Sequence, residues 1–294
     1  MPYRPAIAQG QFWQSDIKGG EMRIGICAPS TPFTRQDADR VIALAAEHHP
    51  AVELVFDDQC FIEQGHFAGS DAQRLEALVR LANDPGFDAI WFVRGGYGAC
   101  RIAADAVAAM KAPARKKTYL GYSDQGNLLA ALYKAGVGWP AHGPMPADIR
   151  RAGGEAAVLR ALGWLAKGDT TALEPNLVKG RRYAAFNLMT LAMLAPTPLM
   201  PDLSGHVLMV EEVSEYLYAF DRAMFSVTTG LKGAALSGLM LGRVSDIPEN
   251  DRPFGSDEEA IAQHWCAKNG IAYLGRADIG HDSGNRIVPF GMIG

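Results

Sequence analysis

Long apolar runs are absent from this chain of 294 residues. No window approaches the roughly 18 consecutive apolar residues that a membrane-spanning helix requires. Residues 1–21 mix polar and apolar side chains without the continuous apolar block of a secretory signal. We therefore expect a cytoplasmic protein with no membrane partner.

An excess of charge of one sign is also absent. The chain has 28 Lys and Arg against 32 Asp and Glu, which gives a formal net charge of -4 at pH 7. Without a large positive charge there is no electrostatic reason to expect a nucleic-acid partner. With 48% hydrophobic and 20% charged residues, the composition is that of an ordinary globular protein.

Cysteines are few, and metal-binding motifs are missing. Cys27, Cys60, Cys100 and Cys266 form no CxxC pair, which argues against a zinc knuckle and against a dense disulfide framework. None of the seven histidines stands in HExxH or a similar spacing. We expect reduced, buried cysteines and an activity that needs neither a metal ion nor another cofactor.

Apolar segments of strand length alternate with helical segments through the first half of the chain. The predicted strands cover residues 23–28, 52–56, 88–93 and 117–122. The connections between them are too long for hairpins. The pattern therefore predicts an α/β fold with a mostly parallel sheet between helices.

The character of the sequence changes from about residue 150, where a helix leads into a polar stretch. We predict an irregular N-terminal extension, an N-terminal α/β domain, a linker and a smaller C-terminal α/β domain, at residues 1–22, 23–168, 169–182 and 183–294. In the last of these we expect strands at 206–210 and 238–242 and helices at 184–194, 215–228 and 257–267.

Ser123 stands where a predicted strand runs directly into a predicted helix, in Tyr119-Leu-Gly-Tyr-Ser-Asp-Gln-Gly126. Such a junction lies at the carboxyl end of the sheet, where open α/β folds bind their ligands. The free N–H groups of the helix behind it favour an anion that develops beside the hydroxyl. The match to GxSxG is incomplete because position 125 is Gln. Ser123 is therefore a candidate nucleophile, with a helix N-cap as the alternative.

A second candidate is the glycine-rich segment Arg94-Gly-Gly-Tyr-Gly98, which also follows a predicted strand. Consecutive glycines let backbone N–H groups approach a ligand closely, as an oxyanion hole or a phosphate cradle requires. The spacing does not fit GxGxxG, because Arg101 stands at the third glycine position, and no Walker lysine follows. A plain tight turn is the alternative.

Two histidines lie on glycine-containing loops where each could be a catalytic base or a turn residue. His142 stands in Ala-His-Gly-Pro, and His281 stands in Ile-Gly-His-Asp. Spacing alone does not choose between them. Glu211 and Glu212 follow a predicted strand, so their side chains are expected to point to opposite faces of the sheet. One could face the space between the domains, or both could be surface carboxylates.

Taken in order, these segments resemble the LD-carboxypeptidases of the S66 serine peptidase family, which also contains the self-immunity peptidases that inactivate microcin C. The shared segments span nearly the whole chain after its first twenty residues, and the ordered set is highly specific. They are Ala28-Pro-Ser30, Phe67-Ala-Gly-Ser-Asp71 with Arg74, Asp88-Ala-Ile90, Arg94-Gly-Gly-Tyr-Gly98, Gly121-Tyr-Ser-Asp124, His142-Gly-Pro144, Glu211 with Asp221-Arg222, and Gly280-His281.

The resemblance implies a triad of Ser123, His281 and Glu211, assembled where the two domains meet. His281 would accept the proton of Ser123 and later deliver it to the leaving amine. Glu211 would hold the imidazole in the useful tautomer and stabilise its cationic form. Ser123 would come from the first domain and the other two residues from the second.

The resemblance further places the oxyanion hole on the backbone N–H of Asp124 together with that of Gly96, with Gly95 as the alternative. It implies a small muropeptide substrate, from which the enzyme removes terminal D-alanine by cleaving an L,D amide in cell-wall recycling. Arg94 could bind the terminal carboxylate or anchor the glycine turn. Family members are often dimers, so a homodimer is expected.

Two other functions are compatible with these residues. One is an amidase that detoxifies peptide-nucleotide antibiotics of the microcin C type, and the other is a muropeptide-binding protein without catalysis. The chain also departs from the family pattern in two places. It reads Ala185-Phe-Asn-Leu188 where many members have Gly-Gly-Asn-Leu, and Ser123-Asp-Gln-Gly-Asn-Leu128 where SDxTAL is usual. Both changes leave the triad in place, and we expect them to act on the pocket contacts.

Overall fold

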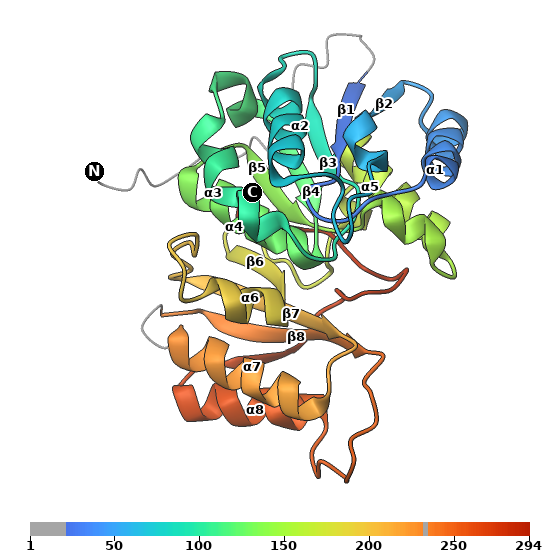
Figure 1. Ribbon diagram of the computed structural model, residues 1–294. Coiled ribbons are helices and arrows are strands. Elements are labelled where there is room, and N and C mark those ends of the chain that lie inside the picture. The colour runs from blue at the N-terminus through green and yellow to red at the C-terminus, as the bar shows by residue number, and fades with distance from the viewer. Residues whose placement is uncertain (1–21, 232–234) are drawn as a thin grey trace.

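Two β-sheets with helices packed against them form the protein (Figure 1). The computed structural model describes residues 22–231 and 235–294. The first sheet has the order β10-β5-β4-β3-β1-β2, and the second has the order β11-β6-β7-β8-β9. The strands are β1 (Met22–Cys27), β2 (Val52–Phe56), β3 (Ala89–Phe92), β4 (Thr118–Gly121), β5 (Trp139–His142), β6 (Arg182–Asn187), β7 (His206–Val213), β8 (Gly238–Ser245), β9 (Tyr273–Arg276), β10 (Val288–Pro289) and β11 (Gly291–Met292).

The predicted α/β class is confirmed, because β1 to β5 pair in parallel in one sheet and β6 to β9 pair in parallel in the other. Among the strands of the described residues, β10 and β11 run antiparallel to their neighbours. No helix in the described ranges is long and apolar enough to cross a membrane. The α-helices are α1 (Arg35–His48), α2 (Asp71–Asn83), α3 (Ala99–Ala109), α4 (Gly126–Ala135), α5 (Gly154–Lys167), α6 (Leu188–Leu194), α7 (Leu217–Gly230) and α8 (Glu258–Asn269).

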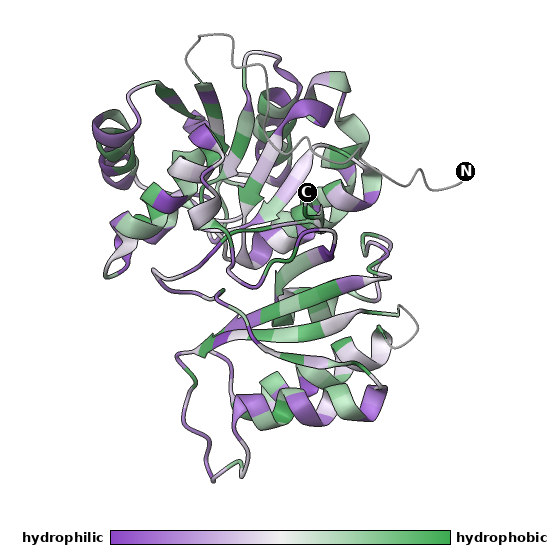
Figure 2. Cartoon of the chain, turned by 180° about the vertical axis from the view of Figure 1, so that it is seen from behind, coloured by the Kyte–Doolittle hydropathy of each residue, from purple (hydrophilic) through white to green (hydrophobic). Residues whose placement is uncertain are grey.

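The central strands form where the sequence is apolar on both faces. All residues of β3 and β4 are buried, as expected of parallel strands covered by helices on both sides. Figure 2 shows strands that are largely hydrophobic and outer helices that carry both hydrophilic and hydrophobic residues. Ser70 caps α2 through a capping box with Gln73, which fixes the start of that helix.

One apolar cluster joins the two halves of the molecule. It contains Leu128 and Leu132 from α4, Phe186 from β6, Leu191 from α6 and Phe290 from the C-terminal segment. The helix that follows Ser123 therefore packs directly against the half that carries Glu211. Because the two halves share a core, their relative position is held by buried apolar contacts.

The predicted helix at residues 184–194 is wrong over its first part. Residues Arg182–Asn187 form β6, which pairs in parallel with β7, and only Leu188–Leu194 are helical. Alanines in this segment suggest a helix, but burial of the segment between sheet neighbours overrides the local propensity. As a result Asn187 lies opposite Glu211 in the sheet register.

The C-terminal tail contributes one strand to each sheet. Val288 of β10 pairs with His142 of β5, and Gly291 of β11 pairs with Tyr183 of β6. The loop that carries His281 precedes these strands and therefore crosses between the two halves. The domain boundaries at residues 168 and 182 remain predictions from the sequence. The predicted extension 1–22 lies outside the described residues, except for Met22 in β1.

Candidate active site

Ser123 lies in a sharp turn between strand β4 and helix α4. The strand ends at Gly121, Ser123 begins a single 3-10 turn, and α4 starts at Gly126. The backbone φ of Ser123 is 60°, in the left-handed region that few non-glycine residues adopt. Such strain at a strand-to-helix turn is typical of a nucleophile elbow. The N-cap interpretation is wrong, because Gln125 is the N-cap of α4 and no side chain caps it.

Buried hydrogen bonds hold this turn from behind. The carboxylate of Asp124 accepts hydrogen bonds from Ser30 Oγ at 2.5 Å and from the N–H of Ala99 at 2.9 Å. Burial raises the pKa of Asp124 even though these donors lower it. Gln125 Nε2 donates to Ser30 Oγ at 2.8 Å and to the carbonyl of Arg94 at 2.7 Å. The glutamine that makes the GxSxG match incomplete thus ties the turn of Ser123 to the glycine turn.

The glycine turn lies against Ser123 so closely that no side chain fits there. A Cβ on Gly95 would lie 2.7 Å from Ser123 Oγ and 3.5 Å from the backbone N of Asp124. Gly96 has φ 111°, and a Cβ there would lie 2.6 Å from Thr31. Thr31 Oγ1 fixes the turn by donating to the carbonyl of Gly95 at 2.7 Å. The structure therefore brings the predicted oxyanion-hole segments together beside the hydroxyl.

His281 and Glu211 form a buried pair. Nδ1 of His281 lies 2.6 Å from Oε2 of Glu211, and the two residues are 8% and 0% exposed. Burial lowers the pKa of His281, but the charge of Glu211 and its hydrogen bond outweigh burial, so the pKa is raised above its usual value. With Nδ1 turned to the carboxylate, Nε2 is left for a second partner. This is the orientation that a general base needs.

A glycine in the neighbouring strand lets the His281 loop reach Glu211. The pairing of β7 with β8 is irregular beside Glu211, where β8 contains Gly242. A Cβ on Gly242 would lie 2.9 Å from Cβ of Glu211 and 2.8 Å from the carbonyl O of Ile279. The next residue, Arg243, donates its N–H to that carbonyl at 2.8 Å. The hydrogen bond between Arg243 and Ile279 thus places the segment directly before His281 next to Glu211.

Glu211 and Glu212 have different partners on different sides, as the strand alternation predicts. Glu212 accepts hydrogen bonds from Asn187 Nδ2 and from the N–H of Met189, each at 2.7 Å. Burial raises the pKa of Glu212 to about 7. Glu212 therefore supports the start of α6 and does not contact His281.

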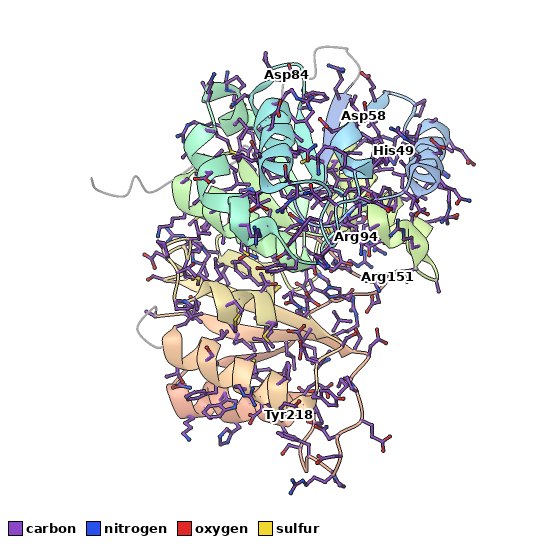
Figure 3. The ribbon with its side chains drawn as sticks, viewed as in Figure 1. His49, Asp58, Asp84, Arg94, Arg151 and Tyr218 are labelled. Carbon is purple, nitrogen blue, oxygen red and sulfur yellow. The ribbon has the colours of Figure 1, made fainter. Side chains whose placement is uncertain are left out.

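Ser123 and His281 line the same cavity, which has a volume of about 390 Å³. The guanidinium-bearing residues Arg94, Arg150 and Arg151 also line it. Figure 3 shows Arg94 and Arg151 near the level where the two halves of the molecule meet. In residues 22–231 and 235–294, no three His, Cys, Asp or Glu side chains are grouped closely enough to hold a metal ion.

Arg94 differs from the other two arginines of the cavity in its partners. Arg150 pairs with Asp37 at 2.6 Å, and Arg151 pairs with Asp148 at 3.0 Å. Arg94 takes part in none of the ion pairs between described residues and donates only to the carbonyl of Pro32, at 3.2 Å. Burial and the nearby Arg150 lower the pKa of Arg94. The negative charge of an anionic ligand would offset both effects and raise the pKa of Arg94 again.

A different arginine anchors the glycine turn. Arg74 is 0% exposed and donates to the carbonyls of Pro29 and Gly98, the latter at 3.0 Å. A Cβ on Gly98 would lie 2.6 Å from Arg74 Nη1, so this end of the turn is closed around the guanidinium. The structural role proposed as the alternative for Arg94 is thus already performed by Arg74.

Tyr122 is a site residue that the sequence reasoning missed. Its ring centroid lies 4.8 Å from that of His281, and its hydroxyl donates to Asp148 Oδ1 at 2.7 Å. Tyr122 also lines the cavity. A buried tyrosine needs a hydrogen-bond partner, and here that partner fixes the ring against the imidazole. The only signal in the sequence is its position next to Ser123.

His142, the other candidate base, does not line the cavity. It is 1% exposed, and neither ring nitrogen has a hydrogen-bond partner among the described residues. Burial and the proximity of His281 lower the pKa of His142 to about 3. His142 packs behind Tyr122, at 5.5 Å between ring centroids. The structure therefore brings His281, and not His142, to the cavity of Ser123.

The two departures from the family pattern meet in the core. A Cβ on Gly126 would lie 3.2 Å from Phe186 and 3.3 Å from Thr190. Gly126 stands where the family pattern has Thr, and Phe186 stands where it has Gly, so the aromatic ring occupies space next to the missing side chain. Phe186 is fully buried and lines no part of the cavity. The expectation that this change alters the pocket contacts is therefore wrong for Phe186.

We predict that Gly126 and Phe186 are energetically coupled. Gly126→Thr should lower the free energy of unfolding by about 1–3 kcal/mol through overpacking, and Phe186→Gly should lower it by about 3–5 kcal/mol through the cavity that it leaves. The double variant should lose clearly less than the sum, because each change relieves the other. Urea unfolding of the wild type, the two single variants and the double variant measures this coupling. Strictly additive losses of the free energy of unfolding would contradict it.

Comparison with known proteins assigns the class and then the family. The protein-family models that match this chain are those of a peptidase, so the chain is a peptide hydrolase. The chain belongs to the peptidase S66 family: residues 24–143 match the LD-carboxypeptidase N-terminal domain, and residues 182–293 match the LD-carboxypeptidase C-terminal domain. The resemblance seen in the sequence is thereby confirmed.

Particular relatives have similar length and fold. The chain is 26% identical to the murein tetrapeptide carboxypeptidase of Pseudomonas aeruginosa, over 99% of this chain and 96% of that protein. The crystal structure of muramoyltetrapeptide carboxypeptidase from Oxalobacter formigenes matches with a TM-score of 0.74 at 23% identity, covering 91% of this chain and 93% of the other. The microcin C7 self-immunity protein MccF matches with a TM-score of 0.73 at 17% identity, covering 92% of each. The last two matches show the fold alone.

Proposed function

We propose that the protein is a cytoplasmic serine LD-carboxypeptidase that releases terminal D-alanine from murein tetrapeptides in cell-wall recycling. The observation that carries the proposal is that the strained Ser123 lines one cavity with His281, whose Nδ1 is paired with the buried Glu211. The full-length similarity to a murein tetrapeptide carboxypeptidase supports the substrate. The proposed substrate partner is a small muropeptide, and the homodimer remains a prediction.

The proposed reaction is acyl transfer through Ser123. His281 Nε2 takes the hydroxyl proton as Ser123 Oγ attacks the carbonyl carbon of the scissile amide. The imidazolium then protonates the amine of D-alanine, which leaves and gives a tripeptidyl ester of Ser123. Water attacks this ester, with His281 again as base, and releases the tripeptide.

The proposed oxyanion hole stabilises both tetrahedral intermediates. Its donors would be the backbone N–H of Asp124 and that of Gly96, with Gly95 as the alternative. Gly95 approaches Ser123 so closely that a Cβ on this glycine would lie 2.7 Å from Oγ, which supports a donor from this turn. Loss of one such donor typically costs roughly 3 kcal/mol of transition-state stabilisation.

Arg94 is proposed to bind the terminal carboxylate of the substrate. It lines the cavity of Ser123 and takes part in none of the ion pairs between described residues, whereas Arg150 and Arg151 already have carboxylate partners. A free carboxylate next to the scissile amide distinguishes the substrate of a carboxypeptidase from that of an endopeptidase. An unpaired guanidinium in this place favours an exopeptidase substrate.

This role predicts a specific dependence on the substrate carboxylate. Arg94→Met should raise KM for the free-acid tetrapeptide about 10- to 100-fold, because a charged hydrogen bond is typically worth about 1.5–3 kcal/mol. The same variant should act on the C-terminal amide of that tetrapeptide as wild type does. The assay is D-alanine or D-alaninamide release by purified protein. Arg150→Met, which removes a guanidinium paired with Asp37, should keep the preference for the acid, and loss of that preference would contradict the assignment.

The second candidate function is hydrolysis of a peptide-nucleotide amide of the microcin C type, which the similarity in fold to MccF supports. Purified protein with the tetrapeptide and with an aminoacyl sulfamoyl adenosine separates the two. We expect the tetrapeptide to have the higher kcat/KM, and the opposite order would favour the second function. A muropeptide-binding protein without catalysis is the third candidate. The backbone strain at Ser123 argues against this third candidate, because binding alone does not require a serine in a strained backbone conformation.

A further inference from the structure

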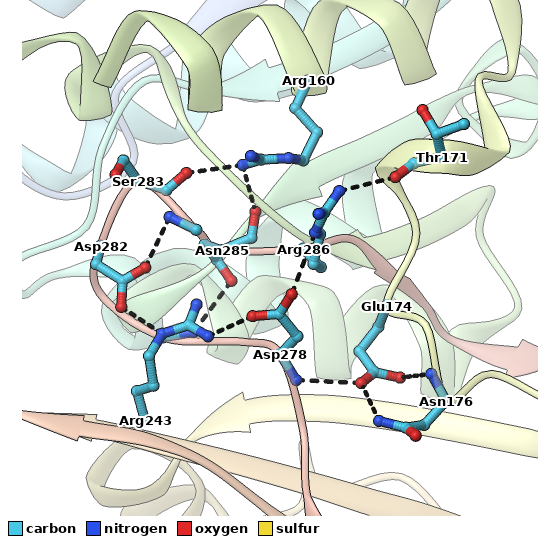
Figure 4. A network of polar contacts seen from close by, with 12 residues as sticks. Arg160, Thr171, Glu174, Asn176, Arg243, Asp278, Asp282, Ser283, Asn285 and Arg286 are labelled. Carbon is cyan, nitrogen blue, oxygen red and sulfur yellow. Dashed lines mark hydrogen bonds and ion pairs between the residues drawn. The ribbon is translucent and has the colours of Figure 1, made fainter. Parts of the chain in front are cut away.

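The loop that carries His281 is clamped from both halves of the molecule. We call residues 277–287, between β9 and β10, the His281 loop. On the C-terminal side, Arg243 of β8 binds the carboxylates of Asp278 and Asp282. Within the loop, Asn285 Oδ1 accepts the N–H of Gly280 at 3.2 Å. These contacts, drawn in Figure 4, give the loop a fixed shape relative to the sheet that carries Glu211.

One side chain ties the same loop to the half that carries Ser123. Nη1 of Arg160, on α5, donates to the carbonyls of Ser283 and Asn285, each at 2.9 Å (Figure 4). Arg160 takes part in none of the ion pairs between the residues that the structure describes. Its guanidinium is therefore committed to the backbone of the loop, two and four residues after His281.

Helix α5 is a rigid support for this contact. Its residues Val158, Ala161, Leu162 and Leu165 are buried in the cluster that also contains the strands β1 and β3 of the first sheet. The start of α5 also approaches the loop, since a Cβ on Gly153 would lie 3.1 Å from Ser283 Oγ. Arg160 thus fixes the His281 loop relative to the first sheet, whose strand β4 leads into Ser123.

We propose that Arg160 is a positioning residue that sets the distance and angle between His281 and Ser123 across the junction of the two halves. This inference rests on the proposed triad. Glu211 orients the imidazole of His281 within the C-terminal half. Arg160 positions the same histidine relative to Ser123, which belongs to the N-terminal half. Misplacement of a reacting group by about 1 Å can cost roughly 100-fold in rate. Loss of the contact between Arg160 and the His281 loop should therefore lower kcat.

Arg160→Met removes the two hydrogen bonds and keeps a side chain of similar length. It should lower kcat about 10- to 100-fold with KM changed little, since the substrate contacts remain. Arg160→Lys, which can still donate to the carbonyls, should recover part of the loss. The matched control is Arg115→Met, which removes a 3.0 Å arginine-to-carbonyl bond to Gly136 away from the cavity and should leave kcat as in wild type.

A double variant separates positioning from general destabilisation. In the His281→Ala background, Arg160→Met should cause no further loss of activity, because the residue acts through His281. An equal loss of kcat in Arg160→Met and Arg115→Met, or an undiminished loss in the His281→Ala background, would overturn the inference.

The rate of covalent labelling of Ser123 by a fluorophosphonate gives a readout that is independent of the substrate. Arg160→Met should label about 10- to 100-fold more slowly than wild type. Wild-type protein that labels but does not cleave the tetrapeptide would defeat only the proposed substrate, and Arg160 would still be tested. Wild-type labelling at the same rate as Arg160→Met would defeat the inference and leave the proposed function intact.

Discussion

Replacing Ser123 with alanine is expected to lower kcat/KM for D-alanine release by roughly 10⁴- to 10⁶-fold. The reason is that the other hydroxyl among the described residues of the cavity lining, that of Tyr122, is held by Asp148 and does not replace the nucleophile. Substrate binding should be retained. The assay is release of D-alanine from the tetrapeptide by purified protein, with circular dichroism to show an unchanged fold.

Ser123→Gly is the matched control for this experiment. It removes the same hydroxyl but also relieves the φ of 60°, which glycine adopts without strain. It should be as inactive as Ser123→Ala but more stable than that variant, by up to about 1 kcal/mol. If either variant keeps substantial activity, Ser123 is not the nucleophile.

Replacing Glu211 with glutamine is expected to lower kcat roughly 10⁴-fold. The amide NH₂ would donate to Nδ1 of His281 and so favour the tautomer in which Nε2 carries the proton and cannot accept another. A buried pair at 2.6 Å leaves little room for an alternative geometry. Steady-state kinetics on the tetrapeptide measures this loss.

The pH profile of the same variant gives an independent check. His281 must be neutral to act as base, so wild-type activity should rise with pH through the raised pKa of His281. Glu211→Gln removes the charge and hydrogen bond that raise this pKa and leaves burial, which lowers it. The acidic limb of kcat/KM should therefore move to lower pH.

Glu212→Gln is the neighbouring control for the pH experiment. Glu212 is also buried, and its pKa is raised to about 7, but its partners are Asn187 and the backbone of Met189. This variant should cost stability while it leaves the acidic limb where it is in wild type. An acidic limb that moves with Glu212 and stays fixed with Glu211 would contradict the assignment.

The sequence predicted the position of Ser123 because the signal is local. An apolar strand that ends directly before a helix determines where that side chain lies in a parallel sheet. Most predicted strands agree with the structure to within about two residues, and Val52–Phe56 agrees at both ends.

The partner of Ser123 could not be predicted from local pattern. His281 and Glu211 are 70 residues apart, and their contact depends on the irregular pairing at Gly242, which has no recognisable sequence signal. His142 is on a similar glycine-containing loop, yet it is buried behind Tyr122. Only the ordered resemblance to a known family distinguished the two histidines.

The features that the sequence does not predict correctly also depend on contacts between residues that are distant in the sequence. The two alanines of residues 182–187 favour a helix in part of this segment, but its pairing with β7 is a long-range interaction that overrides helix propensity. The two-residue strands β10 and β11 are too short to show alternation. In the sequence Gln125 makes the match to GxSxG incomplete, whereas in the structure its side chain links the two turns of the site.

The central claim is that one hydroxyl and one imidazole, contributed by different halves of the chain, form a single reactive site. The most direct measurement is mass spectrometry of the intact protein and its peptides after reaction with a fluorophosphonate. We predict one adduct per chain, located on Ser123, that forms far more slowly in His281→Ala. An adduct on another residue, or a rate that does not change without His281, would contradict the account.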